Sequence, residues 1–106
     1  MENRELMYLA ENAKQKSYSP YSKFKVGAAL LTKDGKIYVG ANIENSSYPL
    51  TVCAERVAFF KAISEGEKEF EKIAISGSND DFCFPCGACR QVMSEFCGKD
   101  FVIILE

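Results

Sequence analysis

Hydrophobic residues recur at helical spacing near the start of the chain. The apolar positions are Leu6, Leu9 or Ala10, and Ala13. Asn3 precedes them, and asparagine is a favoured helix cap, while Lys14 and Lys16 follow them, where the helix dipole stabilises cations. The pattern therefore predicts a first helix that is capped by Asn3 and ends near these lysines.

Two segments with the pattern of strands follow. Residues 24–31 and 37–44 flank Asp34-Gly35, and this arrangement is a strong signal for a β-hairpin. In the second segment one face consists of Ile37, Val39, Ala41 and Ile43. Since side chains alternate along a strand, Asn42 and Glu44 point together to the other face.

The remainder of the chain alternates between helical and strand patterns. Residues 51–65 predict a helix with Cys53, Val57 and Phe60 on one face, ended by Gly66. The later elements are a buried strand at 72–77, a helix from Pro85 to Gly98 with an apolar stripe of Cys89, Val92, Met93 and Phe96, and a strand at 101–105. The last strand is nearly continuous in apolar residues, which is typical of a strand covered on both faces. This order predicts an α/β fold with helices on both faces of a sheet.

Composition narrows the class of protein. The chain has 106 residues, of which 47% are hydrophobic and 26% charged, as expected for one globular domain. A net charge of -2 argues against a protein that binds nucleic acid or an anionic membrane. The longest apolar runs are too short to span a bilayer, and the charged N-terminus is unlike a signal peptide. We therefore expect a cytoplasmic protein with a small-molecule partner.

The chain has 5 cysteines and no histidine. In a reducing compartment, clustered cysteines in odd number indicate metal binding or catalysis before disulfides. Without imidazole, a general base must be a carboxylate, an amine or a metal-bound hydroxide.

Three cysteines stand at predicted helix starts. Cys86 and Cys89 form a Cys-x-x-Cys motif, which alone also fits a redox dithiol, and Cys53 begins another helix. Three thiolates would fill three positions of tetrahedral zinc and leave the fourth for water, as in a catalytic site. Glu55 is the carboxylate best placed to move that water's proton, although an acid in a first helical turn can also be an ordinary solvated residue.

Four motifs together resemble the cytidine deaminases of the small homotetrameric type. They are Phe24-Lys25-Val26-Gly27-Ala28-Ala29, Asn42-Ile43-Glu44-Asn45, Thr51-Val52-Cys53-Ala54-Glu55-Arg56 and Pro85-Cys86-Gly87-Ala88-Cys89-Arg90-Gln91. The resemblance implies a three-layer α/β/α fold with a mixed sheet of order 2-1-3-4-5 and one zinc per subunit. It implies hydrolysis of cytidine and deoxycytidine to uridine and deoxyuridine with release of ammonia, in pyrimidine salvage. We expect residues 1–106 to form a single domain that lacks the C-terminal strand and helix of its relatives, the fifth strand lying beyond the given C-terminus.

The same resemblance assigns roles to residues. It implies zinc ligation by Cys53, Cys86 and Cys89, and proton transfer by Glu55. It implies that Asn42 and Glu44 hold the ribose hydroxyls, that Phe24 packs beside the nucleoside and that the Ala54 N–H meets the base carbonyl. It also implies that Arg56 hydrogen-bonds the thiolates and that Tyr48 lies in a loop reaching a neighbouring subunit.

Other classes remain open at this point. Cys83-x-x-Cys86-x-x-Cys89 spells the first part of an iron–sulfur run, which would make an electron-transfer protein. A structural four-cysteine zinc module using Cys53, Cys86, Cys89 and a spare cysteine is another alternative. Among deaminases, a blasticidin-type enzyme shares the zinc motifs, while the acidic balance disfavours a polynucleotide editor. We expect Cys83 and Cys97 to be buried or half-buried thiols without a metal.

Overall fold

The computed structural model describes residues 1–77 and 87–105, which form a four-stranded mixed sheet between helices. In chain order the elements are α1 (Asn3–Ala13), η1 (Lys14–Lys16), β1 (Val26–Thr32), β2 (Ile37–Ala41), η2 (Tyr48–Leu50), α2 (Ala54–Ser64), β3 (Phe70–Gly77), α3 (Gly87–Phe96) and β4 (Val102–Leu105). The strand order is β2-β1-β3-β4, with β1 antiparallel to both neighbours and β3 parallel to β4. The mixed sheet and the order predicted for its first four strands are confirmed.

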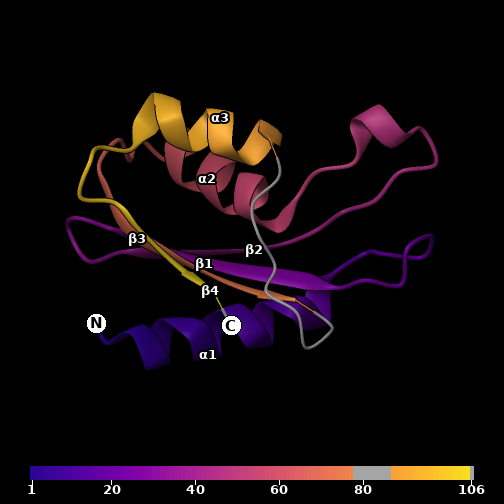
Figure 1. Cartoon of the computed structure of the whole chain (residues 1–106), viewed down its shortest axis with the longest axis horizontal. Helices are drawn as coiled ribbons and strands as arrows, with labels where there is room; N and C mark the ends of the chain where they lie inside the picture. The colour runs from indigo at the N-terminus through magenta and orange to yellow at the C-terminus, as the bar shows by residue number, and fades with distance from the viewer. Residues whose placement is uncertain (78–86, 106) are drawn as a thin grey trace.

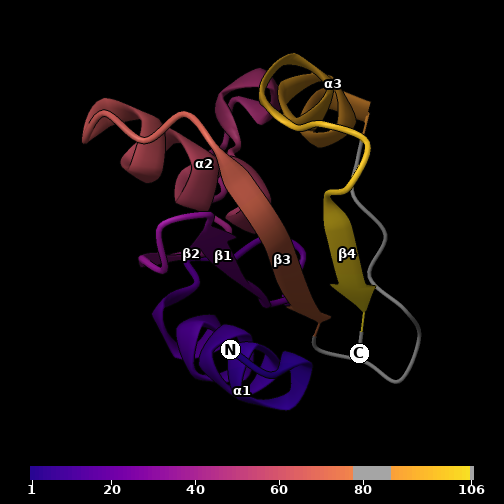
Figure 2. The same cartoon turned by 90° about the vertical axis from the view of Figure 1, so that its left-hand side faces the viewer.

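The helices cover both faces of this sheet. Figure 1 and Figure 2 show α1 on one face and α2 with α3 on the other. Side chains of β1 alternate between the two faces of the sheet and pack against both helical layers. Ala28 and Leu30 pack against α2 and α3, whereas Ala29 and Leu31 pack against α1. The predicted three-layer α/β/α architecture is therefore confirmed.

Several element ends differ from the prediction. Asn3 is the first helical residue and not the cap, because Glu2 stands at the N-cap and the Asn3 side chain accepts a hydrogen bond from Lys72 Nζ at 2.8 Å. β1 begins at Val26 instead of residue 24, and β2 ends at Ala41 instead of residue 44. Beyond Ala41 the chain remains extended only in isolated bridges of Ile43 with Tyr18 and Val52.

The face of α2 predicted from Cys53, Val57 and Phe60 is not the face that the helix buries. Phe60 is 48% exposed, and the helix instead buries Ala54, Glu55, Ala58, Phe59 and Ala62. The reason lies in β2, where a Cβ on Gly40 would come within 2.5 Å of the Ala54 carbonyl oxygen and 2.7 Å of the Ala58 nitrogen. Small residues on both sides thus let the start of α2 approach β2 closely, and the buried face consists of three alanines together with Glu55 and Phe59 in place of Phe60.

The last strand is more exposed than its sequence predicts. Val102 is 48% and Ile103 41% exposed, although we expected both faces of this strand to be covered. β4 pairs with β3 and is the outermost strand of the described sheet. The stripe of α3 is confirmed, since Cys89 and Met93 are buried, with Val92 and Phe96 partly buried against the same core. Within the described ranges no helix is long and apolar enough to cross a bilayer.

Candidate active site

The N-terminal turn of α2 carries the first part of the site. Cys53 occupies the N-cap with an extended backbone, and its side chain makes no capping hydrogen bond. Glu55 follows in the first turn and is only 3% exposed. The first amides of a helix lack intrahelical partners and carry the positive end of the helix dipole, so this turn favours negative charge.

The first turn of α3 carries the second part. Cys89 is 1% exposed and packs in the core cluster that also contains Ala54 and the half-buried Cys53. The two helices lie in the same layer above the sheet (Figure 1), and the thiols of Cys53 and Cys89 are reduced. Cys86, the third predicted ligand, lies outside the described residues. Within the described ranges no three side chains of the metal-ligating types are placed to hold a metal ion.

The carboxyl group of Glu55 faces both described thiols. Its pKa is raised, above all because burial removes the carboxyl from water, and the neighbouring Cys53 thiol raises it further. Hydrogen bonds with its own backbone amide and with Cys89, together with the charge of Arg56, oppose this rise. Glu55 is therefore a buried acid close to two cysteines. The alternative that it is an ordinary solvated residue of a first helical turn is wrong.

Arg56 places a positive charge beside the cysteines. Its Nη2 donates hydrogen bonds to the Thr51 carbonyl at 3.2 Å and to Cys53 Sγ at 3.6 Å. The pKa of its guanidinium is raised, first by the hydrogen bond with Cys53. Its buried Nε finds no hydrogen-bond partner among the described residues. A charged donor aimed at a thiol is what a metal–thiolate group with excess negative charge requires.

These observations fit a zinc ion. Thiolates are soft ligands that suit zinc, and the two described cysteines stand at helix N-termini beside a fixed cation. The buried carboxyl of Glu55 adjoins them and so has the position of a proton carrier. Cys53, Cys89, Glu55 and Arg56 are thus brought together as the sequence predicted.

Asn42 and Glu44 lie across the ends of β1 and β2, near the same helix start. The side-chain oxygen Asn42 Oδ1 accepts hydrogen bonds from the Val26 N–H at 2.9 Å and from the Ser17 hydroxyl. The side-chain nitrogen Nδ2 donates one to the Phe24 carbonyl at 2.9 Å. Asn42 is buried, and these partners fix the orientation of its amide. Its first role is therefore to hold the preceding loop, which its place in a strand pattern did not predict.

Glu44 borders an open pocket of about 320 Å³ that is also lined by Tyr21, Ser22, Asn45, Tyr48 and Thr51. Tyr48 is 82% exposed at the rim. Phe24 is partly buried and packs against the core cluster that contains Ala54 and Cys89. Phe24 thus packs in the same core cluster as the cysteine-bearing turn, while Glu44 and Tyr48 border the pocket that Thr51 also lines.

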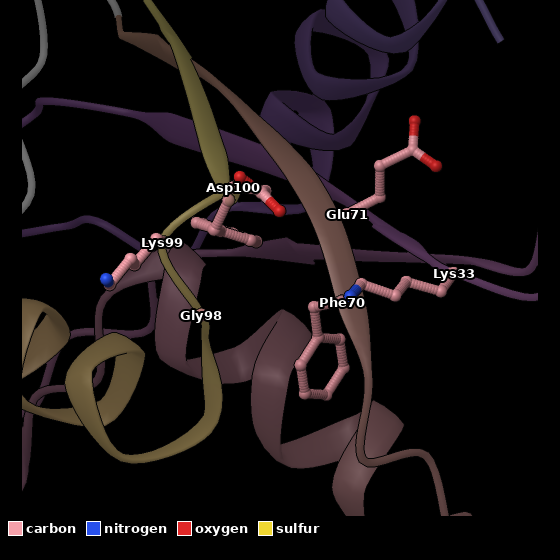
Figure 3. A pocket seen from close by; sticks show the side chains of 7 residues that line it. Lys33, Phe70, Glu71, Gly98, Lys99 and Asp100 are labelled. Atoms are coloured by element: carbon pink, nitrogen blue, oxygen red, sulfur yellow. The ribbon is translucent and has the colours of Figure 1, made fainter.

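A second pocket lies at the other end of the sheet. Its volume is about 300 Å³, and it is formed by Lys33, by Phe70 and Glu71 at the start of β3 and by residues 98–101 before β4. Figure 3 shows the Lys33, Phe70, Glu71 and Asp100 side chains around it. It contains none of the predicted site residues. Open α/β sheets bind ligands beyond the carboxyl ends of their strands, and this pocket lies at the amino ends of β3 and β4.

Three residues that support the site were not predicted from the sequence. Ser17 and Ser22 hydrogen-bond to Asn42 and Glu44, and the Thr51 carbonyl accepts from Arg56. Serine and threonine in loops are common turn residues, so their sequence context gave no signal that distinguished them.

Of the two cysteines without a predicted role, Cys97 lies in the described part of the chain and Cys83 does not. Cys97 is half-buried, as predicted, and burial raises the pKa of its thiol from 9.0 to about 11. Of the three cysteines of the iron–sulfur alternative, Cys83 and Cys86 lie outside the described residues, and Cys89 lies beside Glu55 together with Cys53.

Two cysteines at helix N-termini beside a buried carboxyl are the arrangement expected of an enzyme with a thiolate metal site. Residues 1–105 match the model of the cytidine and deoxycytidylate deaminase zinc-binding region. The chain belongs to this deaminase family.

Relatives and solved structures agree with that assignment. The chain is 50% identical to a cytidine deaminase of Sporosarcina psychrophila, over 99% of this chain and 77% of the relative. It is 51% identical to a cytidine deaminase of Halalkalibacterium halodurans, over 99% of this chain and 80% of the relative. The crystal structure of a cytidine deaminase from Burkholderia pseudomallei superposes with a TM-score of 0.92 at 49% identity, covering 99% of this chain and 84% of that one.

Proposed function

We propose that this protein hydrolyses cytidine and deoxycytidine to uridine and deoxyuridine and releases ammonia. One observation carries the proposal: the buried Glu55 carboxyl faces Cys53 and Cys89 at the start of α2, in a chain of the deaminase family. The cytidine deaminases that match nearly the whole chain at about half identity support the choice of substrate.

Cys53, Cys86 and Cys89 are the proposed ligands of one zinc per chain. Zinc bound by three protein ligands keeps a fourth position for water and lowers the pKa of that water to about 7. Three thiolates outweigh the charge of the ion, and two features of this chain offset the excess. These are the Arg56 guanidinium at 3.6 Å from Cys53 Sγ and the amides of the first turn of α2.

Glu55 is the proposed proton carrier. Its buried carboxylate accepts one proton of the attacking water and donates it to ring N3 of the pyrimidine. It then takes the remaining proton of the added hydroxyl and passes it to the amino group, which departs as ammonia while the carbonyl forms. Burial favours the protonated form of the carboxyl, and the backbone amide and Arg56 favour the ionised form. Both forms are required during one turnover.

The remaining predicted residues recognise the nucleoside. We assign the Ala54 N–H, one of the amides without an intrahelical partner, to the base carbonyl, and Phe24 to packing beside the nucleoside. Asn42 and Glu44 are assigned to the sugar hydroxyls, with the orientation of Asn42 fixed by Val26 and Phe24.

A homotetramer is the proposed assembly. Exposed large apolar side chains gather on the segments that border the nucleoside pocket: Tyr18, Tyr21, Ile43, Tyr48 and Leu50. Apolar patches of this kind mark interaction surfaces. Tyr48, the most exposed of these five side chains, is the residue proposed to reach the neighbouring subunit.

We assign the protein to pyrimidine salvage in the cytoplasm, with a small nucleoside and no nucleic acid or membrane as partner. Zinc ligation by cysteine needs reduced thiols, and thiols stay reduced in such a compartment. The net charge of -2 supports a partner that is neither nucleic acid nor anionic membrane.

The test is to incubate the zinc-loaded protein with cytidine, deoxycytidine and blasticidin S and to quantify ammonia and the deaminated product. We expect both pyrimidine nucleosides to be converted with one ammonia per product, and blasticidin S to be a poor substrate. Turnover of blasticidin S alone would assign the chain to the antibiotic deaminases.

A further inference from the structure

Ser22 connects the proposed sugar-binding carboxylate to the residue that packs beside the nucleoside. Its hydroxyl donates a hydrogen bond to Glu44 Oε2 and accepts one from the Phe24 N–H at 3.0 Å. The other carboxylate oxygen, Glu44 Oε1, accepts from the backbone N–H groups of Tyr21 at 3.0 Å and Ser22 at 3.1 Å. The Glu44 carboxylate therefore accepts three hydrogen bonds from the loop before β1, in addition to those that Asn42 makes with it.

The loop needs this support because its backbone is unfavourable. Lys23 has φ of 62°, and it is the only residue other than glycine with a positive φ in the described ranges. Lysine gains nothing from the left-handed region, which glycine and asparagine occupy more readily. The hydrogen bonds of Ser22 bracket Lys23, since Ser22 precedes it and the bonded N–H of Phe24 follows it. A strained residue held by such bonds is typical of a ligand-binding turn.

We propose that Ser22 is a positioning residue of the nucleoside site, which fixes both the Glu44 carboxylate and the turn that carries Phe24. This inference rests on the proposed function. Ser22 and Glu44 line the same pocket of about 320 Å³, and Phe24 packs against the core cluster that contains Ala54 and Cys89. A change in the turn would therefore displace the carboxylate that meets the sugar and the ring beside the nucleoside together.

The charge of Glu44 is consistent with this arrangement. Its pKa is lowered, first by the hydrogen bond from the Ser22 hydroxyl and then, against the effect of burial, by the Ser22 and Tyr21 amides and the charge of Lys23. Glu44 is thus held ionised and oriented, ready to accept a hydrogen bond from a substrate hydroxyl. The Ser22 side chain itself does not need to touch the substrate.

The experiment compares Ser22→Ala and Ser22→Thr with wild type in the zinc-loaded protein, using cytidine as substrate. Ser64→Ala is the matched control, because that exposed hydroxyl donates only to the Lys61 carbonyl in its own helix. Loss of a hydrogen bond to a charged group should raise KM about tenfold for Ser22→Ala while kcat changes less than about threefold. Ser22→Thr keeps the hydroxyl and should restore KM, and Ser64→Ala should leave it unchanged.

Amide hydrogen exchange of Tyr21 and Phe24, measured without substrate, provides a readout that is independent of activity. We expect both amides to exchange faster in Ser22→Ala than in wild type or Ser64→Ala. An unchanged KM or unchanged exchange in Ser22→Ala, with an active wild type, overturns the positioning role and leaves the proposed function intact. A wild-type protein that binds zinc but does not convert cytidine refutes the proposed function, and the positioning role falls with it.

Discussion

Burying a carboxyl group costs free energy unless neighbouring groups hydrogen-bond to it or offset its charge. Glu55 has such neighbours. It is 3% exposed, with Cys53, Cys89 and Arg56 contributing to its electrostatic environment. Cys53, Glu55 and Arg56 were predictable because the Cys-x-Glu-Arg spacing places them at the start of one helix, and Cys89 was predictable from the Cys-x-x-Cys motif at the start of another. The hydrogen bonds of Asn42 and Glu44 to the loop were not predictable, since they depend on how residues 17–24 fold over the end of β2.

Cys53 and Cys97 should differ in their effect on zinc. Cys53→Ala removes a proposed ligand and should lower the zinc content to less than about one-tenth of wild type and destabilise the fold, because metal binding and folding are coupled. Cys97→Ala should keep full zinc, since Cys97 is half-buried outside the group formed by Cys53, Cys89 and Glu55. Elemental analysis of the purified variants checks this. Full zinc in Cys53→Ala, or loss of zinc in Cys97→Ala, would contradict the ligand assignment.

Cys97 should also react slowly with alkylating reagents. Burial raises the pKa of its thiol from 9.0 to about 11, so near neutral pH its thiolate fraction falls by about 100-fold. The rate of alkylation by iodoacetamide, followed by mass spectrometry of the peptide containing Cys97, should keep rising with pH until about 11. Denatured protein is the control, and its alkylation rate should stop rising at a pH near the ordinary thiol pKa of 9.0. Equal rates for folded and denatured protein at about pH 8 would exclude the shift.

At the scale of elements, the periodicity predicted each α-helix and strand of the described ranges, together with the hairpin, but not the short 3-10 helices η1 and η2. Gly35, the glycine of that predicted turn, indeed adopts a φ of +90°. The pattern failed for the inner face of α2, where the contact is set by Gly40 on another element. The spacing of apolar residues shows which faces of a helix could be buried. Which of these faces is buried depends on the shape of the strand that packs against it.

Gly40→Ala should therefore disturb the site through α2. The new Cβ would come within 2.5 Å of the Ala54 carbonyl oxygen, so the helix must move away, at a cost of about 1 to 3 kcal/mol in the free energy of unfolding. Because Cys53 and Glu55 stand on that turn, zinc affinity should fall as well. Gly98→Ala is the matched control, since its Cβ would meet nothing within 4 Å. Thermal unfolding and zinc titration measure both effects, and equal stability of the two variants would refute the close contact.

At the scale of the whole molecule, the sequence predicted the layers and strand order, and it did not predict how exposed the segments around the pocket lined by Glu44 and Tyr48 are. Tyr48→Ser should weaken the proposed tetramer, because it removes the most exposed aromatic side chain of that surface. Light scattering coupled to size-exclusion chromatography should show a wild-type tetramer and smaller species for the variant. Tyr8→Ser, on the outer face of α1, is the control for loss of an exposed tyrosine. A wild-type monomer with full activity would contradict the assembly.

The most direct measurement is the rate of ammonia release from cytidine by Glu55→Gln, with zinc content determined on the same preparation. Glutamine keeps the shape of the side chain and can hydrogen-bond, but it cannot carry a proton. Glu95→Gln, an exposed residue of α3, is the matched control. We predict full zinc in both variants, wild-type turnover in the control, and a rate lowered about 10²- to 10⁴-fold in Glu55→Gln. Full zinc with near-normal turnover in Glu55→Gln would show that another group carries the proton.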